Sequence, residues 1–146
     1  MQFKLIIDKT KEETVVVTAH EASPLTEKIR RLVQEEVPAD RVAAYLEDEI
    51  RMMSFDKIAC IIAQEGKTFA VDNKGKQYRL KQRLYELETI LPPSFIRINK
   101  SAIANETHIE RYAVGFGGSV DAVFAGGYRE YVSRRCFAEI KRRYHL

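Results

Sequence analysis

The chain has 146 residues, a length that fits one domain of ordinary size or one domain with a small appendage. Its hydrophobic fraction of 45% is enough to build a core, which argues against a disordered chain. No apolar run approaches the ~20 residues that a membrane span needs, and Met1–Asp8 meets charge too early for a signal peptide. We therefore expect a soluble, cytoplasmic protein.

The net charge of +3 is small, but the positive charge is concentrated towards the C-terminal end. Residues 1–41 hold seven Lys/Arg against eight Asp/Glu, whereas residues 42–146 hold seventeen against thirteen. In the last fourteen residues, one acid accompanies five cations, which are Arg134, Arg135, Lys141, Arg142 and Arg143. Such a cluster suits a polyanion, because each cation placed on a phosphate releases a condensed counterion. A solvated basic helix would carry the same charges, so charge alone does not decide the function.

The first 41 residues predict two strands and a helix. Phe3–Ile7 alternates as a strand with one buried face does, and Val15–Val17 predicts a second short strand after a charged turn. Ser23-Pro24 then begins a helix, with serine at the N-cap and proline at the first helical position. Apolar residues recur at helical spacing over Leu25–Val33. This ββα extension is too small for a stable independent domain, so we expect it to pack on the rest of the chain or on a partner.

Residues 42–146 predict a mainly β domain with short helices inserted. Two helices are predicted over residues 81–91 and about 134–144, and Lys100–Asn105 is predicted to be a compact segment between strands. Long βαβ crossovers are absent, which argues against a parallel nucleotide-binding sheet and for antiparallel sheets. The predicted strands cover residues 42–46, 49–53, 58–63, 68–72, 77–80, 95–98, 109–115, 119–124 and 128–132.

The sequence offers no convincing active site. Its three histidines are scattered, with no cysteine or carboxylate at metal-ligand spacing, and Gly117-Gly118 belongs to no phosphate-binding glycine motif. Cys60 lies inside the apolar run Ile58–Ala63, where a core position is favoured over a reactive thiolate. Cys60 and Cys136 are far apart in the sequence and predict two buried free thiols rather than a disulfide. We expect no enzymatic activity, no cofactor, no metal and no small-molecule substrate.

Three ordered motifs resemble the LytTR family of bacterial DNA-binding domains. The segment Ser94–Asn105, which reads SFIRINKSAIAN, is similar to the most recognisable signature of that family. Leu84–Glu88 followed by Leu91-Pro92 resembles its short helix, and Val132–Arg135 resembles its closing element. The resemblance covers about residues 42–146. It implies elongated antiparallel β-sheets with short helices, and a transcriptional regulator that reads short repeated promoter sites.

The resemblance also implies how the domain meets double-stranded DNA, by presenting loops at the sheet ends to successive major grooves. Carried over position by position, three loops provide the contacts, which are Lys67 and Thr68, then Asn99, Lys100 and Ser101, then Ser133, Arg134 and Arg135. Long cationic side chains can reach guanine edges, while hydroxyl and amide groups serve phosphates and base edges.

Two other residues near these loops are expected to be structural. Arg97 lies within a strand and is expected to pair with a carboxylate, and Asn105 is expected to cap local structure. The acidic residue that the family usually carries near Ile62 is missing here, which bears on the geometry of the first loop.

Many LytTR regulators carry a phosphoacceptor receiver domain ahead of the DNA-binding part, and residues 1–41 cannot hold that fold. The resemblance therefore points to stand-alone regulators with a small N-terminal extension, which are often controlled by partner membrane proteins. We expect binding to the repeated site as a homodimer or as two cooperating monomers. The alternative is a protein-interaction module, in which the extension docks a membrane-bound partner or a second copy through the apolar stripe Leu25–Val33.

Overall fold

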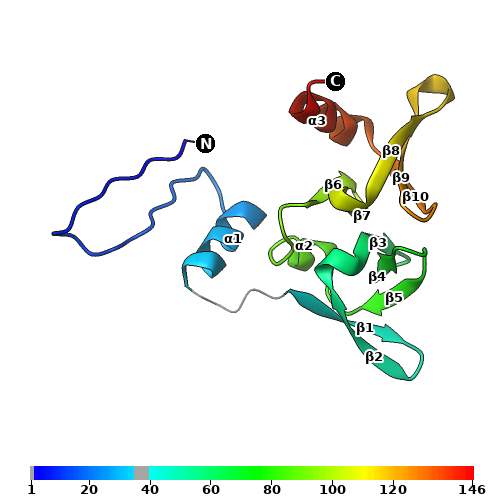
Figure 1. Ribbon diagram of the computed structural model, residues 1–146, viewed down its shortest axis with the longest axis horizontal. Coiled ribbons are helices and arrows are strands. Elements are labelled where there is room, and N and C mark those ends of the chain that lie inside the picture. Colours follow the sequence, from blue (N-terminus) through cyan, green and yellow to red (C-terminus); the bar gives the residue numbers. More distant parts are fainter. Residues whose placement is uncertain (1, 35–39) are drawn as a thin grey trace.

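The computed structural model describes residues 2–34 and 40–146 and consists mainly of β-strands (Figure 1). The helices are α1 (Pro24–Val33), α2 (Leu84–Leu87) and α3 (Arg134–Tyr144), with short 3₁₀ turns at Phe55–Lys57, Glu106–His108 and Phe116–Gly118. The strands are β1 (Arg41–Leu46), β2 (Glu49–Ser54), β3 (Ile58–Gln64), β4 (Lys67–Asp72), β5 (Gln77–Leu80), β6 (Phe95–Asn99), β7 (Ala102–Asn105), β8 (Ile109–Val114), β9 (Val120–Phe124) and β10 (Arg129–Val132).

The strands form two antiparallel sheets. The larger sheet has seven strands in the order β2-β1-β5-β4-β3-β7-β6, and the smaller sheet has three in the order β10-β9-β8. Every paired register is antiparallel, as the absence of βαβ crossovers predicted. The predicted fold class of antiparallel sheets with short helices is therefore confirmed.

The seven-stranded sheet is covered on both faces. One face packs under α2, with Leu80, Leu84 and Leu87 in the same core cluster. The other face packs against the small sheet and α3, where Phe124 and Ile140 are buried. Residues 58–62 of β3 are buried in succession, which fits a central strand with protein on both sides. The two cores fix the small sheet and α3 on one face of the large sheet.

The boundaries of most predicted strands are confirmed within one or two residues, but Lys100–Asn105 was wrongly predicted as a compact segment. Residues 102–105 form β7, which pairs with both β3 and β6. All four residues of β7 are buried, so the strand lacks the alternation of polar and apolar residues that signals a half-buried strand. The predicted helix over 81–91 is also shorter, because α2 ends at Leu87 and tight turns continue to Leu91.

The N-terminal extension differs from its prediction. Helix α1 begins at Pro24 with Ser23 as its N-cap, as predicted, and the Ser23 side chain accepts a hydrogen bond from the Thr26 amide. Neither Phe3–Ile7 nor Val15–Val17 is a strand, because neither segment finds a hydrogen-bonded partner strand among the described residues. Figure 1 shows residues 2–22 as an extended arm that turns back towards α1. No residue of α1 is buried, and Leu25, Leu32 and Val33 of its apolar stripe are exposed.

Candidate nucleic-acid interface

The first two predicted DNA-contacting loops lie side by side at one end of the large sheet. Strands β3 and β4 are joined by the tight turn Glu65-Gly66, in which both residues have positive φ. Strand β3 also pairs with β7, and beyond the last paired residues the Ala63 amide donates a hydrogen bond of 2.8 Å to the Ser101 carbonyl. This bond holds the β3–β4 turn against the β6–β7 turn, where Lys100 and Ser101 lie.

The third predicted loop, the junction between β10 and α3, is joined to the second. The Ser133 amide donates to the Ile98 carbonyl at 2.8 Å, and the Asn99 side-chain amide donates to the Tyr131 carbonyl at 2.6 Å. The three loops therefore form one continuous surface, here called the turn cluster, which consists of residues 64–67, 99–101 and 133–135. The first two turns meet because β3, β7 and β6 are neighbours in the large sheet. The third turn reaches them because β10, in the small sheet, contacts β6.

The turn cluster presents exposed cations. Lys67, Lys100, Arg134 and Arg135 are all exposed, and within residues 2–34 and 40–146 no carboxylate lies within ion-pair distance of them. Lys100 and Arg135 line the same open groove of about 620 Å³, together with Ser133. Unpaired cations on an open surface remain free to bind an anion without first breaking an internal ion pair.

Two predicted contact residues are buried. Thr68 is 7% exposed within β4, between its partners Ala63 and Leu80, and Asn99 is 8% exposed. The Asn99 carboxamide is fully engaged, since its Oδ1 accepts from the Ser101 amide at 2.7 Å while its Nδ2 donates to Tyr131. Ser133 is the N-cap of α3, and its hydroxyl accepts from the Cys136 amide at 3.2 Å. These side chains shape the turn cluster from within.

Arg97 braces the second turn, a role that the sequence predicted only in part. Its Nε donates to Glu88 Oε1 at 2.6 Å, which confirms the predicted pairing with a carboxylate. Its Nη1 also donates to the Lys100 carbonyl at 2.9 Å. The guanidinium therefore connects the end of α2 to the backbone of the β6–β7 turn. The predicted capping role of Asn105 is likewise confirmed, because its Oδ1 accepts from the Thr107 amide at 3.2 Å.

The cysteines do not form a reactive site. Cys60 is fully buried, and desolvation together with the nearby Glu130 carboxylate raises the pKa of its thiol. A raised pKa keeps the thiol protonated and unreactive near neutral pH. Both cysteines are free, but Cys136 is only partly buried, so the prediction of two buried thiols holds for Cys60 alone.

No three His, Cys, Asp or Glu side chains gather in a way that could hold a metal ion within residues 2–34 and 40–146. In the same ranges, no helix has the length and apolar character required to cross a membrane.

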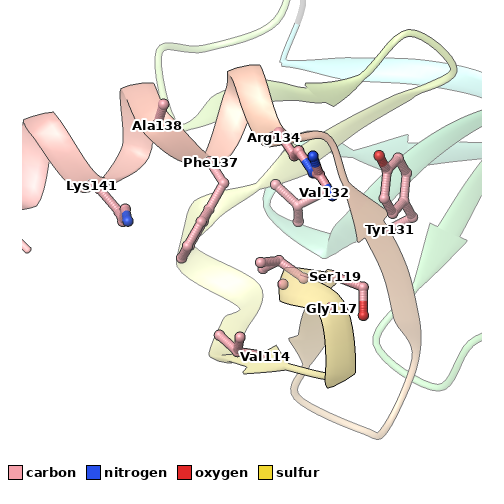
Figure 2. A pocket seen from close by; sticks show the side chains of 11 residues that line it. Val114, Gly117, Ser119, Tyr131, Val132, Arg134, Phe137, Ala138 and Lys141 are labelled. Atoms are coloured by element: carbon pink, nitrogen blue, oxygen red, sulfur yellow. The ribbon is translucent and has the colours of Figure 1, made fainter.

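A second groove, which the sequence did not predict, lies on the other side of the β10–α3 junction (Figure 2). It has a volume of about 630 Å³ and runs between α3 and the tip of the β8–β9 hairpin. Arg134 and Lys141 line it from α3, and Ser119 lines it from the hairpin tip. Tyr131 borders both grooves. The sequence feature that could have drawn attention to this hairpin tip is Phe116, an aromatic residue set among glycines, which is fully exposed there.

Comparisons with known proteins identify the family of the chain. The LytTr DNA-binding domain family matches residues 48–145 of the chain. An uncharacterized HTH-type transcriptional regulator of Staphylococcus aureus strain NCTC 8325 is 29% identical over 144 residues, which cover 98% of this chain and 97% of that protein. Its counterpart in the bovine strain RF122 is 27% identical over the same span.

The fold is similar to that of a solved LytTr DNA-binding domain from Bacillus cereus. The TM-score is 0.66 at 24% sequence identity, and the match covers 73% of this chain and 98% of that domain. The HTH-type name of the staphylococcal relatives does not describe the present fold. Helices α2 and α3 are separated by five strands, so these two helices cannot form a helix-turn-helix.

Proposed function

We propose that this chain, which belongs to the LytTR family of DNA-binding domains, is a bacterial transcriptional regulator. It binds repeated promoter sites sequence-specifically. The turn cluster is the surface that meets the duplex. The observation that carries the proposal is the hydrogen bonding that joins its three turns, from Ala63 to Ser101 and from Ser133 to Ile98. Because these turns are joined, their cations can enter neighbouring grooves of one duplex together.

The predicted contact residues are assigned different roles according to their exposure. Lys100 and Arg135 share one groove and are exposed, so we assign them to base edges or phosphates, together with Lys67 and Arg134. Ser101 and Ser133 are partly exposed and have hydroxyls that suit phosphate contacts. Thr68 and Asn99 are buried, so we assign them to positioning the turns rather than to the DNA. This assignment narrows the contact set inferred from the resemblance.

The test begins with selection of a binding site from random duplexes by the full-length chain. Fluorescence anisotropy then compares the wild type with Lys100→Ala and Arg135→Ala on the selected duplex and on a scrambled duplex. Each substitution should weaken binding to the selected site by roughly 1–3 kcal/mol and reduce the preference over the scrambled site. Lys57→Ala, an exposed lysine outside the turn cluster, is the control and should bind as the wild type does. Unchanged preference in both variants would show that the turn cluster does not read DNA.

A second role, as an interaction module, is favoured by the N-terminal arm. Phe3, Leu5 and Ile7 are 90%, 71% and 82% exposed, and α1 buries none of its residues. Large apolar side chains left in water mark a surface that partners cover. We propose that the arm and α1 dock a second copy of the chain or a regulatory membrane protein, while the LytTR domain binds DNA.

A further inference from the structure

We propose that the groove between α3 and the β8–β9 hairpin, here called the tip groove, holds the sugar–phosphate backbone of DNA that flanks the bases read by the turn cluster. This inference rests on the proposed function and adds a fourth contacting element to it. Apart from Arg134, which belongs to the third loop, its residues lie outside the three loops that the family resemblance implies. The tip groove is lined by Arg134 and Lys141 on α3 and by Gly117, Gly118 and Ser119 at the hairpin tip.

The charge of the tip groove suits a polyanion. Its lining contains two cations and no aspartate or glutamate. Lys141 has no carboxylate partner within the described ranges, and its Nζ lies 5.4 Å from the centroid of the Phe137 ring on the groove wall. Figure 2 shows Arg134, Phe137 and Lys141 projecting from α3 on the side that faces the hairpin tip. Two cations about two helical turns apart could each neutralise a phosphate of the same strand.

The hairpin tip allows close approach of a backbone. Gly117 and Gly118 have φ of 75° and 80°, and a Cβ added at either would meet no atom within 4 Å, so both face open space. The hydroxyl of Ser119, which borders the groove, can donate to a phosphate oxygen. Phe116 extends fully exposed from the same turn. Phe116 does not line the groove itself, but an exposed apolar side chain on this turn can contact the deoxyribose and base faces that lie between phosphates.

The tip groove is also continuous with the turn cluster. Tyr131 borders both grooves, and Arg134 follows directly after Ser133, which lies in the first groove. A duplex seated on Lys100 and Arg135 would therefore extend across Tyr131 towards the hairpin tip. Binding at the tip groove would lengthen the contact along the DNA rather than create a separate site.

The experiment measures how affinity depends on the length of the flanking DNA. The full-length chain and its Phe116→Ala/Lys141→Ala variant are titrated with the selected site in a long duplex and in duplexes shortened stepwise from each end. Ile50→Ala/Lys57→Ala, which likewise removes one exposed apolar side chain and one exposed lysine, is the matched control. Circular dichroism confirms that all three proteins are folded.

We expect shortening from one end to weaken wild-type and control binding by about tenfold, because phosphates are removed from the tip groove. The Phe116→Ala/Lys141→Ala variant should bind the long duplex more weakly than the wild type does. Shortening should weaken its binding less than it weakens wild-type binding, because Arg134 and Ser119 remain in the tip groove but Lys141 does not. The variant's slope of log Kd against log salt on the long duplex should be smaller by about 0.9 for the lost Lys141 contact.

Two results would overturn the inference. One is equal loss of affinity on shortening in the wild type and the variant, and the other is no effect of shortening in the wild type. Either result with specific binding retained would leave the turn cluster as the DNA-binding surface. Loss of specific binding by the wild type on every duplex would instead contradict the proposed function itself.

Discussion

The exposed lysine of the second turn depends on a partly exposed neighbour, Arg97, for its position. The backbone carbonyl of Lys100 accepts a hydrogen bond from Arg97 Nη1. Arg97 is itself held in place because its Nε donates a hydrogen bond to Glu88. A side chain that orders the backbone of a binding loop lowers the entropy lost when the loop binds. We therefore propose that Arg97 acts mainly by positioning Lys100, although it lines the same groove.

Arg97→Lys should weaken specific DNA binding by about fivefold to tenfold, because a single ammonium cannot bond Glu88 and the Lys100 carbonyl in the forked geometry of a guanidinium. Hydrogen exchange at the Ser101 amide should become faster. The salt dependence of binding should not change, since no phosphate contact is removed. Arg79→Lys on β5 is the control. Wild-type affinity and wild-type exchange in the Arg97 variant would show that the brace has no role in binding.

The structure divides the predicted contact residues by exposure. Lys100 and Arg135 were predicted as contacts, and both are exposed in one groove. Asn99 and Thr68 were predicted as contacts from their place in the loops, yet both are buried. Whether a strand-end side chain faces inward depends on register and on the chain that covers it, here β10 for Asn99. Neither is visible in a local sequence pattern.

At the scale of elements, the two sheets are joined at the ends opposite the turn cluster by a close contact of turns. Gly126, between β9 and β10, approaches Asn73, between β4 and β5, so that a Cβ added at Gly126 would lie 2.1 Å from the Asn73 carbonyl oxygen. Gly127 has nearly the same φ, 95° against 96°, but its Cβ would meet nothing within 4 Å. Substitutions at these two glycines can therefore be compared to separate the effect of steric contact from that of backbone strain.

Gly126→Ala should lower the free energy of unfolding more than Gly127→Ala does. Both substitutions pay for positive φ, about 1 kcal/mol, and only the first adds overpacking, about 1–3 kcal/mol. Urea denaturation followed by circular dichroism measures both values. Equal losses of stability in the two variants would mean that the turns are not in contact in solution.

Strands that are marked by their own local sequence pattern were predicted well. Elements that depend on tertiary contacts were not. The hairpin β3–β4 follows from an apolar run, a glycine turn and a second run, and it was predicted with its boundaries nearly correct. Strand β7 was missed because Ala102–Asn105 is buried throughout and has no polar face to mark its period. The arm segments have strand-like alternation, but they lack a partner strand in the described chain. Alternating polar and apolar residues indicate that a segment can form a strand, but the segment becomes a strand only when it pairs with another one.

At the scale of the whole molecule, the arm and α1 are separate in composition from the body that binds DNA. The LytTr match covers residues 48–145, and the solved Bacillus cereus domain corresponds to 73% of the chain. Charge divides in the same way, since residues 1–41 are slightly acidic and the remainder is basic. This division suggests that the extension contributes assembly rather than DNA contact.

A chain that starts at Asp40 should fold and keep specific DNA binding within about threefold, because its core clusters contain no residue of the extension. Asp40 is retained because its carbonyl accepts a hydrogen bond from the Phe55 amide. Sedimentation velocity should show weaker self-association than in the full chain, owing to the loss of the exposed apolar arm. If the shortened chain folded but no longer bound DNA, the extension would belong to the DNA-binding surface.

The proposed function requires three turns from distant parts of the sequence to touch one stretch of duplex at the same time. This requirement is tested most directly by DNA cleavage from an iron chelate on an introduced cysteine, placed in turn at Lys67, Lys100, Arg135 and Lys57. The parent protein carries Cys136→Ser, and its remaining cysteine, Cys60, is fully buried. We expect strand cleavage from Lys67, Lys100 and Arg135 within or beside the selected site, in neighbouring grooves, and none from Lys57. Cleavage from only one of the three turns, or cleavage from Lys57, would contradict the proposal that the three turns bind one duplex together.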